Sequence, residues 1–123
     1  MRMPRPTDDD KELFRDLVSD FAGASVKPMF ANLGAFVNGW MFAGLLGNVI
    51  GVKLLDEDVR EELRAAPGTV GFGPGDEPLR EYVGLPTSWP RDELSEWLGV
   101  AFAESAARPP KPPKVAKAER EEV

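Results

Sequence analysis

The hydrophobic residues of the chain follow two different periods, and the first of them is helical. Between residues 8 and 23 the apolar side chains recur at the spacing of a helix face, at Leu13, Phe14, Leu17, Val18 and Phe21. Thr7 or Asp8 can cap the start of such a helix, and Gly23 can end it. The pattern therefore predicts an amphipathic helix, preceded by a short flexible lead over residues 1–7.

The second period is that of a β-strand, and two turn signals interrupt it. Asn38-Gly39 is a strong hairpin signal, because a type I′ turn needs a positive φ at both central residues. Gly47-Asn48 follows nine residues later and is typical of a type II′ turn. Together these signals predict a three-stranded meander over residues 34–37, 40–46 and 49–54.

The second half of the chain alternates between the two periods. Asp56 can cap a second helix, which buries Val59 and Leu63 and ends at Pro67-Gly68. Residues 69–73 and 79–84 have the pattern of two further strands, joined by a turn-rich segment. Pro90 suits the first turn of a final helix. The inward stripe expected for that helix is Leu94, Trp97, Leu98, Ala101, Phe102 and Ser105.

These elements give the order α-β-β-β-α-β-β-α. We expect a two-layer α+β domain over residues 8–107, with three helices and an antiparallel sheet of about five strands. From Arg108 onward the chain is rich in Pro and charge, which predicts a disordered tail over residues 108–123. The run PPKPPK within this tail could alternatively dock into a reader of polyproline segments.

The two turns set the strand register, and the register decides which side chains share a face. The expected pairs across the first turn are Val37 with Trp40, Phe36 with Met41, and Ala35 with Phe42. One face of the meander then has no polar residue, and we expect it to lie beneath the helices as the core. Its members are Phe36, Met41, Ala43, Leu45, Ile50, Val52 and Leu54.

The other face of the meander is nearly apolar as well, although a two-layer fold normally leaves such a face to water. It carries Ala35, Val37, Trp40, Phe42, Leu46, Val49 and Lys53. Exposed apolar patches mark contact surfaces, and Trp and Phe are common interface anchors. We therefore predict a protein-protein interface at Val37, Trp40, Phe42, Leu46 and Val49, flanked by Lys27 and Lys53, with a second copy of the chain as a candidate partner. A terminal helix or the 69–84 strands covering this face, or a small-molecule cleft, are the alternatives.

Composition narrows the chemistry that is available. The chain has 123 residues, 42% of them apolar, which is enough for one domain with a core. It contains no Cys and no His, which excludes Ser-His-Asp triads, Cys-His pairs, disulfides and most zinc sites. The single Tyr, Tyr82, is expected to pack with its hydroxyl at a rim. The acidic runs 8–10 and 56–58 are expected to cap helices. We predict no enzyme, no cofactor and no catalytic or metal-binding residue.

The charge is unevenly distributed along the chain. The formal net charge is −6, and residues 1–7 and 108–123 carry +2 each, which leaves −10 on residues 8–107. A body this acidic repels phosphate backbones, so direct nucleic-acid binding is disfavoured. Weak, salt-sensitive binding through the two basic ends is the alternative. No apolar run is long enough for a membrane span, and acidic residues follow Arg2 and Arg5 where a signal peptide would be apolar. We expect a cytoplasmic protein.

A series of short motifs in a fixed order covers about four fifths of the chain. They are Lys27-Pro28-Met29-Phe30, Phe36-Val37-Asn38-Gly39, Met41-Phe42-Ala43-Gly44, Lys53-Leu54, Pro67-Gly68, Leu85-Pro86 and the Pro-Lys-Pro-Pro run after Trp97. In this order they resemble the N-terminal domain of the TfoX/Sxy family. Ala31 departs from the family pattern, which has Gly there, so we expect the tight turn around Gly34 instead.

The resemblance implies a two-layer fold akin to secretion-chaperone-like domains and a regulatory role without catalytic residues. Full-length members of the TfoX/Sxy family are coactivators of natural-competence genes, thought to act with the cAMP receptor protein, and carry a second, helical domain. We expect this chain to be a stand-alone version of the N-terminal domain, so the competence role carries over only in part.

Overall fold

The computed structural model describes residues 5–29, 32–73 and 78–111 of the chain. The elements follow one another as α1 (Asp8–Ser19), β1 (Ser25–Met29), β2 (Asn32–Val37), β3 (Trp40–Leu46), β4 (Val49–Lys53), α2 (Glu57–Arg64), β5 (Tyr82–Pro86) and α3 (Arg91–Ala106). The five strands form one antiparallel sheet in the order β1-β2-β3-β4-β5.

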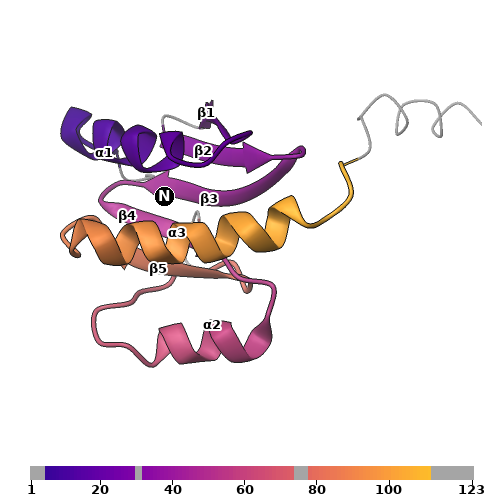
Figure 1. The fold of residues 1–123 in the computed structure, drawn as a ribbon. Coiled ribbons are helices and arrows are strands. Elements are labelled where there is room, and N and C mark those ends of the chain that lie inside the picture. The colour runs from indigo at the N-terminus through magenta and orange to yellow at the C-terminus, as the bar shows by residue number, and fades with distance from the viewer. Residues whose placement is uncertain (1–4, 30–31, 74–77, 112–123) are drawn as a thin grey trace, which may run out of the picture.

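The helices lie on one side of this sheet and at one edge of it. Figure 1 shows α1 and α3 lying across the same face, while α2 lies beyond β5. We call the face against α1 and α3 the helix face, and the opposite one the open face. The expected two-layer α+β class, with five antiparallel strands and three helices among the described residues, is confirmed.

The order of the elements differs from the expected one at β1 and at the segment before β5. β1 was not predicted, because Lys27 and Pro28 interrupt the apolar pattern expected of a strand. Pro is nevertheless tolerated at the edge of a sheet, and β1 is the edge strand. Residues 69–73 form no strand, and only Val70 bridges to Gly84. The predicted turn around Gly34 is also wrong, since Gly34 lies within β2. Ala31 lies outside the described residues.

The helix starts agree with the sequence. The Thr7 hydroxyl accepts a hydrogen bond from the Asp10 N–H at 3.1 Å, and the Asp10 carboxylate accepts one from the Thr7 N–H at 3.2 Å. This reciprocal pair is a capping box, and it satisfies two amide groups that the helix leaves free. The Asp56 carboxylate accepts from the N–H groups of Asp58 and Val59. Helix α3 begins at Arg91, directly after Pro90.

A β-bulge between β2 and β3 decides which aromatic side chains are buried. Ala35 pairs with Ala43, but the next residue, Phe36, pairs with Met41, so that Phe42 has no residue directly opposite it. One extra residue on β3 shifts the alternation of side chains by one position. The hairpin on one side of the bulge therefore presents the opposite set of side chains to the helices from the set that strict alternation predicts.

The predicted faces are consequently right after the bulge and wrong before it. Ala43, Leu45, Ile50, Val52 and Leu54 are fully buried in the core, as expected. Val37 and Phe42, expected on the exposed face, are buried too, and the Phe42 ring lies 6.5 Å from Phe21 and 5.4 Å from Phe102 between ring centroids. The half-buried Phe36 and Met41 lie on the open face instead.

Four glycines lie side by side across the open face. The strand register aligns Gly34 with Gly44, Gly44 with Gly51, and Gly51 with Gly84. The ring of Phe72, only 3% exposed, lies directly on Gly51. The Met29 sulfur and Val70 approach Gly34 and Gly84 in the same way. We call these four residues the glycine row; it lets the side chains of β1 and of the segment before β5 approach the backbone of the sheet.

Replacing Gly51 by Ala should therefore destabilise the fold, because the added methyl group would overlap the Phe72 ring. We expect a loss of about 1–3 kcal/mol in the free energy of unfolding, the usual cost of overpacking. The matched control is Gly99→Ala in α3, where the nearest atom to a Cβ is 3.6 Å away on Phe21. That change should stabilise the protein by about 0.5–1 kcal/mol through helix propensity. Urea unfolding measures both; equal effects would contradict the role given to Phe72.

Candidate functional site

The open face contains a pocket that the glycine row makes possible. Its volume is about 240 Å³, and it lies where the sheet has no side chain at Gly44 and Phe72 fills only part of the space. The lining residues come from β1 to β3, from the segment before β5 and from β5. They are Met29, Asn32, Leu33, Met41, Gly44, Leu45, Leu46, Phe72, Leu79 and Tyr82.

The wall formed by Phe72 is held in place by backbone hydrogen bonds. Val70 exchanges two hydrogen bonds with Gly84, at 2.9 and 2.7 Å, and so fixes the segment before Phe72 to β5. The Leu79 N–H donates to the Phe72 carbonyl at 2.7 Å. The Phe72 ring also stacks on Tyr82, with centroids 5.4 Å apart and an interplanar angle of 27°. The pocket wall is therefore a built part of the fold.

The polar side chains of the pocket lining form hydrogen bonds with backbone groups. Asn32 is 2% exposed, and its Oδ1 accepts a hydrogen bond from the Gly47 N–H at 3.0 Å. The Tyr82 hydroxyl donates to the Met41 carbonyl at 3.3 Å. Burial, with a smaller contribution from the negative charge of Glu81, raises the pKa of Tyr82 to about 12. Tyr82 therefore stays neutral and poorly suited to proton transfer near neutral pH.

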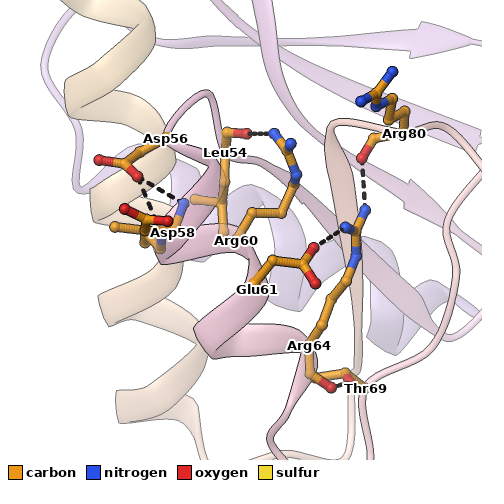
Figure 2. A network of polar contacts seen from close by, with 9 residues as sticks. Leu54, Asp56, Asp58, Arg60, Glu61, Arg64, Thr69 and Arg80 are labelled. Carbon is orange, nitrogen blue, oxygen red and sulfur yellow. Dashed lines mark hydrogen bonds and ion pairs between the residues drawn. The ribbon is translucent and has the colours of Figure 1, made fainter.

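Next to the pocket, two arginines of α2 bind backbone carbonyls (Figure 2). Arg60 is 7% exposed, and its Nη1 donates to the Leu54 carbonyl at 2.8 Å. Arg64 donates from Nη2 to the Arg80 carbonyl at 2.6 Å and from Nη1 to Glu61. These bonds join α2 to the end of β4 and to the residues before β5. Arg60 and Arg64 thus hold the helix at the sheet edge.

The predicted interface residues are divided between the two faces. Val37 and Phe42 are buried on the helix face, and Trp40 is half-buried at the end of the β2–β3 hairpin. Leu46, Val49 and Lys53 lie on the open face, but only Leu46 lines the pocket. The structure therefore does not bring the predicted set together.

The two predicted lysines each have a partner on the open face. The Lys27 ammonium lies 5.3 Å from the centroid of the Phe36 ring, and that of Lys53 lies 3.8 Å from the Glu81 carboxylate. Glu81 is half exposed, so the ion pair contributes little to stability. Of the acidic run 56–58, Asp56 caps α2, and Glu57 and Asp58 lie in its first turn. Within the described parts of the chain, no group of three acidic residues could hold a metal ion.

Sequence reasoning missed Met29, Phe72 and Leu79, which form much of the pocket wall. The available signal was the glycine in each of the four strands β2 to β5, because Gly inside a strand often marks a close approach of other groups. The predicted tail begins with residues that contact the sheet. Arg108–Lys111 contact the β2–β3 hairpin, whereas residues 112–123 lie outside the described residues.

Comparisons of the chain with protein-family models, with curated proteins and with solved structures found no match. Across residues 5–29, 32–73 and 78–111, none of the helices has the length and apolar character needed to cross a membrane.

Tyr82 gives a direct test of the packing around the pocket. Because it is the one Tyr of the chain, the tyrosinate absorbance near 295 nm reports this group alone. We expect a midpoint near pH 12 in the folded protein and near pH 10 in denaturant. A midpoint near 10 in the folded protein would contradict the burial of the hydroxyl.

The same shift predicts a loss of stability at high pH. The unfolded chain releases the Tyr82 proton from about pH 10, whereas the folded chain keeps it to about pH 12. Stability from this group is therefore complete below pH 10 and falls as the pH rises to 12, by about 3 kcal/mol. Tyr82→Phe is the control, because the phenylalanine variant should lose less stability than the wild type over that interval.

Proposed function

We propose that this chain is a non-catalytic, regulatory interaction domain that binds an apolar side chain of a partner protein in the pocket of the open face. The observation that carries the proposal is where apolar surface stays exposed. Among the described residues the large apolar side chains that remain exposed are Val70, at 47%, and Leu79, at 41%. Leu79 lines the pocket, and Val70 belongs to the same segment on the same face.

The form of the pocket supports a role in binding rather than in catalysis. Its lining contains one titratable group, Tyr82, whose pKa of about 12 leaves it protonated at neutral pH. The other walls are mainly aliphatic, aromatic and thioether groups. Met29 and Met41 have flexible side chains that can adapt to different apolar groups. A pocket of about 240 Å³ has room for one large side chain, which is how interface anchors are accommodated.

A regulatory role is the part of this proposal that rests on the TfoX/Sxy resemblance. The motifs on which the resemblance depends include Met29, Met41 and Gly44, which lie at the pocket. Homodimerisation and a cytoplasmic location also remain predictions. A second copy of the chain would have to supply its own exposed apolar group, and Val70 and Leu79 are the candidates on the described surface.

Binding of a small apolar molecule is the second candidate function, and the apolar lining of the pocket supports it. The apolar floor and walls would suit an uncharged ligand of modest size, because burial of apolar surface would supply most of the binding free energy. A small molecule and a partner side chain would occupy the same space, so one variant can test both.

Leu79→Glu should weaken binding, because it places a charge at the rim of an apolar pocket while changing a side chain that is already 41% exposed. We expect affinity to fall at least about tenfold, with little loss of stability. Ala103→Glu is the matched control, since Ala103 is exposed on α3 in the other layer. Affinity purification from the source cells, repeated with chemical crosslinking at the pocket, compares the three proteins.

The proposal predicts a protein that crosslinks to the pocket of the wild type and of Ala103→Glu but not of Leu79→Glu. Light scattering of the pure chain shows whether a second copy is that partner, since Leu79→Glu should then dissociate a dimer. Native mass spectrometry of the purified chain detects a small ligand instead. If all three proteins retain the same partners and the same mass, the open face is not the binding surface.

A further inference from the structure

The tip of the β2–β3 hairpin binds the residues that follow α3 through hydrogen bonds. Both lie at the same end of the molecule in Figure 1. The indole Nε1 of Trp40 donates to the Pro109 carbonyl at 2.7 Å, and the Lys111 N–H donates to the Asn38 carbonyl at 2.9 Å. The Asn38 side chain donates to the Ala106 carbonyl at 3.1 Å and lies 3.5 Å from that of Arg108. The contacts therefore follow the backbone of this segment from Ala106 to Lys111.

Two cations of the segment lie against the Trp40 ring. The guanidinium carbon of Arg108 is 3.5 Å from the ring centroid, and the Lys111 ammonium is 5.5 Å from it. Such cation–π contacts are strongest on Trp. One indole therefore binds a carbonyl through its edge and cations through its face.

The turn residues Asn38 and Gly39 both form the hairpin turn and accommodate the bound segment. Asn38 and Gly39 have φ angles of 54° and 83°, as a type I′ turn requires. A Cβ on Gly39 would lie 3.0 Å from the Cβ of Lys111, so the missing side chain also makes room for the bound segment. The Asn38 amide, which the turn itself does not need, is used on α3 and the segment.

This chemistry is that of a site for extended proline-rich segments. Such segments keep their carbonyls free, and aromatic grooves with a donor N–H recognise them. The bound segment contains Pro109 and Pro110 between two basic residues. The sequence repeats the Pro-Pro-Lys unit at once, at residues 112–114.

We propose that the hairpin tip, Asn38–Trp40, is a recognition site for extended Pro-Pro-Lys segments, with Arg108–Lys111 as its resident ligand. A partner polypeptide with the same chemistry competes for the tip in trans. The site lies away from the pocket of the open face, so the proposal stands independently of the proposed function. A purely structural strap would make the same contacts within one chain but would show no affinity for a separate peptide.

The experiment uses the full chain with Arg108→Ala, Pro109→Gly and Pro110→Gly, which weakens the resident segment. The probe is the blocked peptide Ala-Arg-Pro-Pro-Lys-Pro-Pro-Lys, and the control peptide has glycine for each proline. The Trp40 indole N–H signal in nitrogen-correlated NMR spectra is the readout, assigned with Trp40→Phe. The Trp89 and Trp97 indole signals report that the fold is intact. If the triple variant does not fold, Arg108→Ala alone, which removes the cation nearest the Trp40 ring and leaves the hairpin tip unchanged, is titrated in its place.

We expect the Trp40 signal to move in the variant and to return toward its wild-type position as the peptide is added, with saturation. The wild type should respond at least about tenfold more weakly, because its own segment is present at a millimolar effective concentration. The glycine peptide should bind at least about fivefold more weakly, because it is not pre-organised. An unmoved Trp40 signal in the variant, no saturable response to the proline peptide, or an equal response to the glycine peptide would each overturn the proposal.

Discussion

The packing of Phe42 beneath α3 is the interaction on which the rest of the structure depends. The ring is fully buried between Phe21 and Phe102, and it reaches that position only because a bulge in β3 gives the strand one extra residue. Burying a Phe side chain contributes about 1.5–3 kcal/mol, more than the bulge loses in one strand pairing. The bulge also turns Met41 toward the open face, where it forms a wall of the pocket, and leaves Trp40 at the end of the hairpin. The extra residue of the bulge therefore sets the positions of both the pocket and the hairpin-tip site.

The two faces of the sheet are covered in different ways. Large side chains from the sheet and from the helices fill the helix face, so that Leu45, Ile50 and Leu85 have no exposed surface. None of the helices in the described parts of the chain lies over the open face. The glycine row instead leaves the backbone of the sheet accessible there. Phe72 and Met29 then reach across the row and bury part of the face without a second layer. The cover is incomplete, since the short segment before β5 cannot fill the whole trough. The pocket is the space that this partial cover leaves, which explains both its apolar lining and the exposure of Leu79 at its rim.

Much of the fold could be predicted from local signals, whereas the site could not. Asp56 and Pro90 mark helix starts through interactions within one turn, and Asn38-Gly39 marks a hairpin through its own φ angles. The bulge has no such local signal, because it depends on where the Phe42 ring finds space between Phe21, just after α1, and Phe102 of α3. Strict alternation therefore assigned Phe42 to the wrong face while assigning Ile50, one turn later in the same meander, correctly. The pocket required knowing that glycines on four strands align, and sequence spacing cannot give that before the register is known. β1 was hidden because Pro28 is compatible only with an edge, and edges are defined by the whole sheet.

The tail shows how a segment without a core pattern can still be recognised by the fold. Arg108–Lys111 has no apolar periodicity, and composition alone predicts disorder for it. Its backbone carbonyls are nevertheless free to accept hydrogen bonds, because a Pro-rich segment does not form a strand ladder. The side chains of Asn38 and Trp40 at the hairpin tip supply the donors. The acidic body further favours a basic segment over a neutral one, because the net charge of residues 8–107 is −10 when the +2 of each terminal segment is removed from −6. Recognition here comes from backbone geometry and charge, which are properties that another polypeptide can share. The half-buried Trp40 at the hairpin tip, with this segment already bound, is thus a different kind of surface from the pocket on the open face. The bulge places the two surfaces on opposite sides of one small sheet.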